Sequence, residues 1–278
     1  MKKINRRSFL AAAGLTAAAL ALTACGGSAS STASSTASSA ASSEAASTSA
    51  AAELTTVEAG KLTMATNAAF PPYEMTTDAG EFEGIDIDTA KAIAEKLGLE
   101  LQIDDMDFDV ALLSVQQGKA DIVMAGVTVT DERKAVMDFS DSYATGIQSI
   151  IVPEGSDITS PDDLAGKKIG TQRGTTGYIY CSDDFGDDAV VAYDDGLTAV
   201  QALNNGQVDA VVIDNAPAKE FVAANPGLVI LDTSYAEEDY AIGLAKGSAL
   251  EDAVNAALEE LKADGTLQSI VDKYITAE

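Results

Sequence analysis

The chain has 278 residues, of which 46% are hydrophobic, and it carries a formal net charge of −27 with no histidine and no tryptophan. This length can supply one large domain or two smaller ones, each with a real core. The acidic balance argues against nucleic acid as a partner, which needs a basic surface, and the lack of histidine excludes histidine-based acid–base chemistry and histidine-ligated metals.

Residues 1–24 have the layout of an export signal, because a basic start is followed by an apolar run over 9–23. Leu22-Thr23-Ala24-Cys25 resembles a lipobox, in which Cys25 becomes the first mature residue and carries lipid. An uncleaved anchor is the alternative. Arg6-Arg7 resembles a twin-arginine motif, but the general secretory route stays open. Loss of four basic residues with the signal would take the net charge from −27 to −31.

Residues 25–54 are almost entirely Ser, Ala and Thr after the two glycines behind Cys25. Such a segment cannot bury a core, and we expect a flexible tether that spans on the order of 25–30 Å. No later stretch is apolar and long enough to cross a bilayer. We therefore expect a soluble folded part outside the cell, anchored to the membrane through lipid on Cys25. With Cys25 modified, Cys181 has no partner for a disulfide, and we expect it to be a buried small hydrophobe.

The folded part begins with a predicted strand over 61–66 and a proline-stiffened loop over 67–74. An apolar stripe predicts a helix that ends at Leu97 before Gly98, and a strand over 99–103 and a helix from Phe108 to Gly118 follow. Phe70 could wall a pocket or plug the core. Asp86 and Asp88 could ligate a metal, but they lack a calcium-loop pattern, and we favour solvated or capping roles.

Residues 125–133 form the junction between a buried strand over 122–124 and a helix with Thr130 as its predicted N-cap. Ligands bind at such junctions in open α/β sheets. Arg133 lies one turn into the helix, where its guanidinium could hold a carboxylate with two hydrogen bonds. A surface arginine on an amphipathic helix is the alternative.

The pattern then begins again, with predicted strands over 147–152 and 167–170, a short helix over 160–164, and a glycine-flanked turn over 172–177 that could cradle an anion. Residues 116–123 and 204–211 share a helix stop at glycine followed by an aspartate that opens a buried strand. Two similar α/β lobes are the simplest account. The chain is completed by a strand over 229–231, a return strand over 238–244 and two amphipathic helices. The apolar positions of the first helix are Leu250, Val254, Ala257 and Leu261, and those of the second are Leu267, Ile270, Val271 and Tyr274.

Taken together, these segments resemble the extracytoplasmic solute-binding proteins of amino-acid ABC importers, solute-binding family 3, over about 61–275. The resemblance rests on residues 70–74, 84–88, 126–140, 170–176, 206–210 and 264–267. It implies an α/β clamshell of type II with two crossover strands, lobe 1 formed by 55–148 and 241–278 and lobe 2 by 149–240. It also implies a binding protein rather than an enzyme, without cofactor or metal.

The resemblance also implies roles for individual residues. Arg133 would hold the α-carboxylate of an amino acid, Thr128 would add a hydroxyl, and Gly126 and Thr176 would add backbone groups. Asp214 would take the α-ammonium, and Phe70 and Phe108 would sandwich the side chain. The family often has Asp where Asn67 stands, and glutamine-binding members have Lys where Gln172 stands. Since Asn67 and Gln172 are neutral, we expect a polar ligand such as glutamine or cystine; an acidic ligand would need Arg173 to face inward, whereas we expect it to face solvent.

The expected partners are the permease and ATPase subunits of an importer, with the chain itself a monomer. Two alternatives remain at this point. The chain could be the ectodomain of an amino-acid sensor that signals through a separate receptor. It could also be an enzyme similar to cyclohexadienyl dehydratase, with Glu74 or Asp214 as proton donor.

Overall fold

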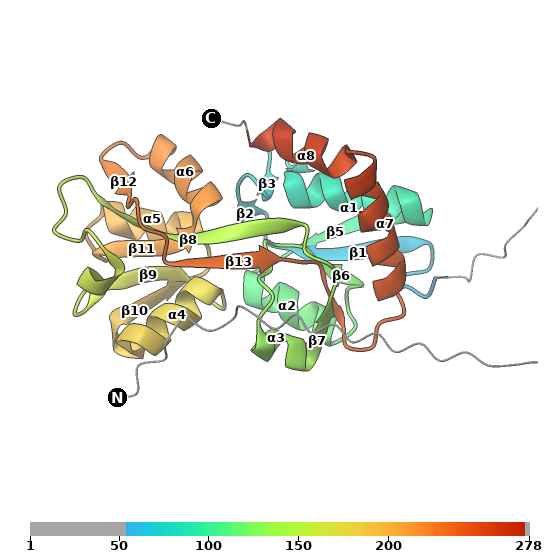
Figure 1. Ribbon diagram of the computed structural model, residues 1–278, viewed down its shortest axis with the longest axis horizontal. Coiled ribbons are helices and arrows are strands. Elements are labelled where there is room, and N and C mark those ends of the chain that lie inside the picture. The colour runs from blue at the N-terminus through green and yellow to red at the C-terminus, as the bar shows by residue number, and fades with distance from the viewer. Residues whose placement is uncertain (1–53, 276–278) are drawn as a thin grey trace, which may run out of the picture. The chain divides into compact units, whose positions relative to one another are not determined.

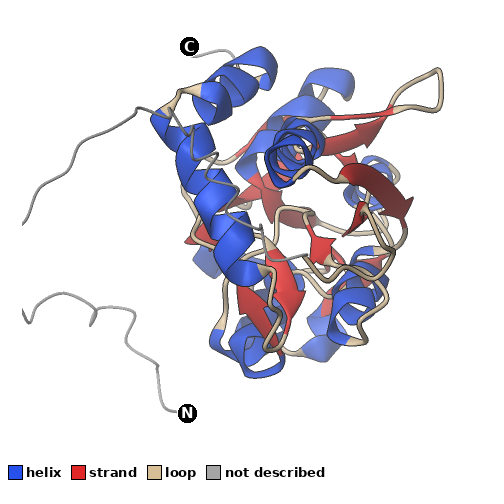
Figure 2. Ribbon diagram, turned by 90° about the vertical axis from the view of Figure 1, so that its right-hand side faces the viewer, coloured by secondary structure: helices blue, strands red, loops and turns tan. Residues whose placement is uncertain are grey.

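The computed structural model describes residues 54–275, so the predicted export signal, Cys25 and nearly all of the predicted tether lie outside the described residues. Residues 54–275 form two α/β lobes, each built on one main sheet (Figure 1). In the end-on view of Figure 2, helices surround the strands on their outer sides. The predicted two-lobe α/β architecture is confirmed.

The main sheet of lobe 1 has the strand order β5-β1-β6-β14-β7. β1 pairs in parallel with β5 and β6, and β14 is antiparallel to β6 and β7. These strands are β1 Lys61–Thr66, β5 Glu100–Asp105, β6 Ile122–Val123, β7 Met137–Phe139 and β14 Gly243–Ala245, and a small second sheet holds β2 Ala69–Phe70, β3 Glu74–Thr76 and β4 Phe82–Glu83. The helices are α1 Ile85–Leu97, α2 Phe108–Gln116, α3 Asp131–Val136, α7 Glu251–Ala263 and α8 Thr266–Tyr274.

The sheet of lobe 2 has the order β10-β9-β11-β8-β12, with β13 paired to β8. β9 is parallel to β10 and β11, whereas β8 is antiparallel to all of its neighbours. The strands are β8 Ala144–Pro153, β9 Ile169–Gln172, β10 Val190–Tyr193, β11 Ala210–Asp214, β12 Leu228–Ile230 and β13 Ala236–Tyr240. The helices are α4 Thr176–Phe185, α5 Gly196–Asn204 and α6 Asn215–Ala224, with short 3₁₀ helices η1 Pro161–Leu164 and η2 Asp187–Ala189.

Apolar side chains are buried on both faces of each main sheet, and the strands β6 and β11 are accordingly almost entirely apolar. Along β11, Val211 and Ile213 join a cluster with α5 and α6, whereas Ala210 and Val212 join one with α4. Cys181 of α4 is fully buried in the latter cluster, as predicted, and burial raises the pKa of its thiol to about 12. A thiol in this setting is an inert packing group.

The internal repeat is confirmed as the same construction in both lobes. Gly118 and Gly206 stop their helices in the left-handed conformation, with φ of 65° and 66°. Asp121 then accepts a hydrogen bond from the backbone N–H of Thr63 (2.8 Å), and Asp209 accepts one from that of Lys168 (2.8 Å). In each lobe the aspartate thus ties the start of a central strand to the neighbouring parallel strand.

The lobes are joined by β8 and β13, which lie side by side between them (Figure 1). The prediction of one return strand over 238–244 is wrong, because the chain forms two strands: β13 pairs with β8, and β14 enters the sheet of lobe 1. Tyr240 ends β13 and is fully buried. A Cβ on Gly146 would lie 2.5 Å from its ring, so only glycine lets the two crossover strands pack here.

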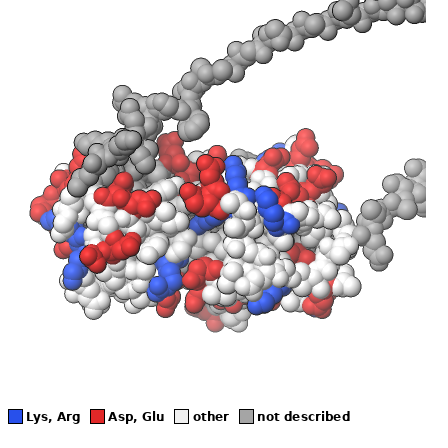
Figure 3. All heavy atoms as spheres, turned by 90° about the horizontal axis from the view of Figure 1, so that it is seen from below, with Lys and Arg blue, Asp and Glu red and all other residues white. Residues whose placement is uncertain are grey.

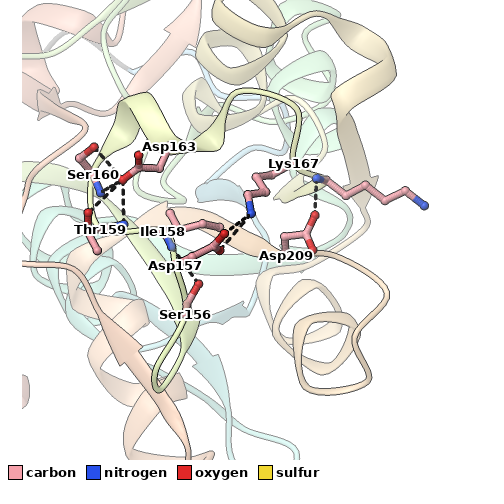
Figure 4. A network of polar contacts seen from close by, with 9 residues as sticks. Ser156, Asp157, Ile158, Thr159, Ser160, Asp163, Lys167 and Asp209 are labelled. Carbon is pink, nitrogen blue, oxygen red and sulfur yellow. Dashed lines mark hydrogen bonds and ion pairs between the residues drawn. The ribbon is translucent and has the colours of Figure 1, made fainter.

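Side-chain hydrogen bonds fix the loop between β8 and β9 (Figure 4). Asp163 accepts from the backbone N–H groups of Thr159 and Ser160, both at 3.0 Å, and so caps the short helix η1. Lys167 pairs with Asp157 at 2.9 Å. This loop leads into β9, whose last residue, Gln172, lines the cavity described below.

Exposed ion pairs supplement the packing of helices on the outside of lobe 1. Lys96 of α1 reaches Glu260 of α7 at 3.0 Å, and Lys273 of α8 reaches Asp88 of α1 at 2.7 Å. Pairs of this kind contribute at most about 1 kcal/mol each.

On the face in Figure 3, acidic side chains cover more of the surface than basic ones, in keeping with the acidic composition. Among residues 54–275, no helix combines the length and apolar character needed to cross a bilayer.

Helix α1 shows how a glycine sets the position of a later site. Its predicted stripe is buried, including Ile87 and Ile93, and it ends at Gly98 in the left-handed conformation. The helix begins just after Gly84, whose φ is 130° and whose missing Cβ would overlap the carbonyl oxygen of Tyr73. This close approach brings α1 against the loop that carries Phe70 and Glu74.

We expect Gly84→Ala to lower the free energy of unfolding by about 3 kcal/mol or more, because it adds a backbone clash to an unfavourable φ. Gly80→Ala is the matched control, since Gly80 also has a positive φ (79°) but open space around its missing Cβ; it should cost about 1 kcal/mol. Denaturant titration of both variants measures the difference. Equal losses would show that the contact with Tyr73 is not the constraint.

Candidate functional site

A cavity of about 440 Å³, its mouth included, lies between the two lobes. All nine residues that the resemblance implied as ligand-binding line it: Asn67, Phe70, Phe108, Gly126, Thr128, Arg133, Gln172, Thr176 and Asp214. The cavity is completed by Glu74, Ala125, Gln148, Thr175, Val212, Ile213 and Tyr240. The structure therefore brings the predicted set together, with each lobe supplying part of the wall.

Arg133 is buried at the junction of the lobes, with 8% of its surface exposed. Thr130 is the N-cap of α3, as predicted, and accepts from the backbone N–H of Arg133. The guanidinium donates to the carbonyl of Thr128 (2.7 Å) and to that of Gly174 in lobe 2 (3.0 Å), and stacks over Phe108 with its Cζ 5.4 Å from the ring centre. The alternative of a surface arginine is thus wrong.

Arg133 has no ion-pair partner within 4.0 Å among residues 54–275. Burial lowers the pKa of the guanidinium, and Glu238 opposes this only at longer range. A guanidinium stays protonated even so, and a buried charge is stable when an anion meets it. The cavity therefore favours an anionic group next to Arg133.

Asp214 lies across the cavity, at the end of β11 in lobe 2. It also caps α6, since it accepts from the backbone N–H of Ala216 (3.0 Å), and it accepts a second hydrogen bond from the backbone N–H of Ile147 in β8 (2.7 Å). Burial raises the pKa of its carboxyl to about 6. At neutral pH the group is ionised and buried, a suitable acceptor for a cationic group.

Phe70 ends the short strand β2, which follows β1, and Phe108 begins α2, which follows β5; both line the cavity. Phe70 stacks on Tyr73 with ring centres 5.9 Å apart. A Cβ on Gly126 would lie 3.0 Å from the Phe70 ring, so the glycine lets this ring approach the backbone. Phe70 thus lines the cavity and also packs against the core of lobe 1.

Asn67 and Gln172 form a direct contact between the lobes. The Gln172 side-chain amide donates to Oδ1 of Asn67 (2.8 Å) and to the carbonyl of Asp194 (3.2 Å), and the Asn67 amide donates to the carbonyl of Met106 (2.9 Å). Both side chains are buried and neutral. Arg173, the next residue, faces solvent and lies 3.4 Å from Asp194, as predicted.

Thr128 and Thr176 have a partner that sequence analysis missed. Both hydroxyls donate to Oε2 of Glu238, at 3.1 and 2.9 Å, and the Gln148 amide donates to the same atom at 3.0 Å. Because a threonine hydroxyl has one proton, donation from Thr128 to a bound anion requires that proton to leave Glu238. The available signal was the period-two pattern of β13, which places Glu238 on the same face as Tyr240.

Asp86 was expected to be solvated or to cap a helix, and this is wrong. It is fully buried and accepts from the backbone N–H of Gly126 (3.0 Å) and the hydroxyl of Tyr143 (2.8 Å). The N–H of Gly126 is therefore already engaged, which leaves its carbonyl for a ligand. Asp86 and Asp88 point to different partners, and residues 54–275 hold no cluster of three His, Cys, Asp or Glu side chains that could bind a metal.

Glu74 is buried beside Asp86 and borders the cavity. Burial, followed by the neighbouring Asp86, raises the pKa of Glu74 well above its usual range, and burial raises that of Asp86 to about 6. Two such carboxyls share a proton, because both cannot ionise at close range. At neutral pH Glu74 is therefore the protonated member, and Arg133 and Asp214 are the charged groups that line the cavity.

We expect Glu74→Gln to stabilise the protein more at pH 8 than at pH 4.5. In the unfolded chain Glu74 ionises above a pH of about 4.3, whereas in the folded state it keeps its proton. The contribution of Glu74 to the free energy of unfolding is therefore present at low pH and is lost as the pH rises. Glutamine mimics the protonated form without this loss. The gain at pH 8 should be about 1–3 kcal/mol by denaturant titration. A difference between variant and wild type that does not change with pH would contradict the assignment.

Residues 62–277 match the family model described as bacterial extracellular solute-binding proteins, family 3. The chain belongs to this family, a class of extracellular binding proteins. Relatives include a protein of Neisseria gonorrhoeae named "Probable histidine-binding protein", 32% identical over 99% of this chain and 98% of the relative, and the L-cystine-binding protein TcyJ of Escherichia coli, 33% identical over 80% and 85%. These relatives are named as binding proteins and not as enzymes.

Solved structures agree with this assignment. An ancestral arginine-binding protein bound to glutamine superposes with a TM-score of 0.75 at 43% identity, over 78% of this chain and 99% of that one. The arginine-, lysine-, histidine-binding protein ArtJ of Geobacillus stearothermophilus also gives 0.75, at 34% identity, over 78% and 96%. The fold is thus the type II clamshell of amino-acid binding proteins.

Proposed function

We propose that this protein binds a polar amino acid between its lobes and delivers it to an ABC importer. The observation that carries the proposal is the pairing of an uncompensated buried guanidinium, Arg133, with a buried carboxylate, Asp214, across one cavity. An amino-acid zwitterion presents the complementary charges. Arg133 would bind its carboxylate in lobe 1 and Asp214 its ammonium in lobe 2, so the bound ligand favours the closed state.

The rest of the cavity suits a ligand without net charge. With Glu74 protonated, the charges of Arg133 and Asp214, the two charged groups that line the cavity, cancel. A zwitterion without net charge has one group to pair with each of them. Phe70 and Phe108 would contact the aliphatic part of its side chain. The Gln172 amide donates both of its N–H groups to protein atoms, so its oxygen would accept from the polar end of the ligand, and the second N–H of the Asn67 amide would donate to it. We therefore favour glutamine or cystine; arginine, which several relatives are named for, is the main competitor.

The predicted anchoring and partners stay within this proposal. An export signal over 1–24, lipid on Cys25 and a tether over 25–54 would hold a monomeric binding protein at the outer side of the membrane, within reach of a permease and its ATPase. The lobe boundaries proposed from the sequence, 55–148 with 241–278 and 149–240, place one boundary inside β8 and the other directly after β13. An enzymatic role would instead appear as turnover of prephenate or arogenate.

The direct test is calorimetric titration of the purified protein with each common amino acid and with cystine, after refolding to remove carried-over ligand. We expect one or a few tight ligands, and we expect Arg133→Ala to weaken binding by about 100-fold or more, since it removes a buried charged hydrogen-bonding partner. Arg173→Ala is the matched control and should bind like wild type, because the Arg173 side chain is half exposed and is not among the residues that line the cavity. No binding across the panel by a folded protein would overturn the proposal.

Ligand affinity should also depend on pH through Asp214. The ammonium binds the ionised carboxylate, so affinity is full above the pKa of about 6 and falls by about tenfold per pH unit well below it. Asp214→Asn should bind weakly, with little dependence on pH between 5 and 8. If the asparagine variant keeps the slope of the wild type, another group such as Asp86 is the one that titrates.

A further inference from the structure

Glu238 is a buried carboxylate on a crossover strand, and none of the roles given above uses it. It has 6% of its surface exposed, whereas Glu237 and Asp239 on either side are exposed. It does not line the cavity, but Thr128, Gln148 and Thr176, which donate to it, all do. Glu238 therefore holds three parts of the cavity wall from behind.

The three donors come from different parts of the molecule. Thr128 follows β6 in lobe 1, Gln148 lies on the crossover strand β8, and Thr176 begins α4 in lobe 2. All three donors bind the same atom, Oε2 of Glu238. The hydroxyls of Thr128 and Thr176 are therefore held close together as long as both hydrogen bonds are present. A movement that separates the lobes must break at least one of these bonds.

The backbone indicates which bond breaks. The N–H of Val129 donates to the carbonyl of Asp239 (3.0 Å), and the N–H of Ala241 donates to the carbonyl of Val127 (3.1 Å). These bonds fasten the Thr128 segment to the end of β13, so Thr128 and Glu238 stay together. The hydrogen bond from Thr176 therefore connects α4 of lobe 2, through Glu238, to the Thr128 segment of lobe 1.

We propose that Glu238 is a latch and positioning residue for the closed state: its carboxylate captures the Thr176 hydroxyl when lobe 2 closes, and so slows ligand release and fixes the wall next to Arg133. This rests on the proposed function, in which closure around an amino acid retains the ligand. The latch belongs to the protein rather than to the ligand, so it acts on whichever amino acid is bound and also favours closure in its absence.

The test compares Glu238→Gln with Glu237→Gln, which removes the same charge from the neighbouring exposed position. Binding kinetics should show a dissociation rate about tenfold higher for Glu238→Gln, since the charged acceptor of the Thr176 hydrogen bond becomes a weaker, neutral amide oxygen. Its binding stoichiometry should be unchanged and its association rate should not fall, because the ligand first meets the open form, which the variant populates at least as much as the wild type does. Glu237→Gln should match wild type. A partly unfolded variant would instead lower the stoichiometry and leave the dissociation rate alone.

Thr176→Val provides the second variant, because valine keeps the backbone N–H and removes only the hydroxyl. If the latch is correct, Thr176→Val should raise the dissociation rate as Glu238→Gln does, and the double variant should be no faster than either single one. Multiplying effects in the double variant, or a dissociation rate for Glu238→Gln within twofold of Glu237→Gln, would overturn the proposal.

A measurement without ligand separates the latch from the proposed function. Spin labels at Val136→Cys in lobe 1 and Leu197→Cys in lobe 2, both at exposed positions, report the distance between the lobes in a background with Cys25→Ser. Glu238→Gln and Thr176→Val should both shift the unliganded distance distribution toward the open form, and Glu237→Gln should not. If no amino acid binds the wild type, the proposed function fails and this distance alone decides the latch: an unshifted distribution rejects it.

Discussion

A buried guanidinium without a carboxylate partner is the constraint on which the rest of this structure depends. Removing Arg133 from water costs several kcal/mol, and two backbone carbonyls offset only part of that cost. One of those carbonyls, that of Gly174, belongs to the other lobe. The guanidinium is thus held at the interface between the lobes. An anion that binds there would pair with the buried charge and bring both lobes into contact with the same ligand.

The two crossover strands explain how such an interface can form and part. β8 and β13 pair with each other and carry Gln148, Glu238 and Tyr240 into the floor of the junction. Each lobe has its own buried clusters on either side of its sheet. The lobes can therefore move as rigid bodies, and the binding groups come together only where they meet.

The acidic character of the chain has little to do with the chemistry of this cavity. Acidic groups on the surface are solvated or paired, whereas burial raises the pKa values of Glu74, Asp86 and Asp214. One proton shared between Glu74 and Asp86 leaves Arg133 and Asp214 as the charged groups that line the cavity. A zwitterionic ligand then meets a charged partner at each of its two ends.

The sequence by itself determined the α/β repeat, the helix stops at Gly98, Gly118 and Gly206, and the cap at Thr130, because these follow from local backbone preferences and apolar periodicity. The resemblance to a family supplied residues that the structure gathers around one cavity. Only the tertiary structure decided that the return strand breaks in two, that Asp86 is buried, and that Glu238 joins both lobes. Those outcomes depend on which distant segments come into contact. The sequence shows that a residue has a carboxylate, but it does not show whether that carboxylate contacts water, a backbone N–H or three donors from both lobes.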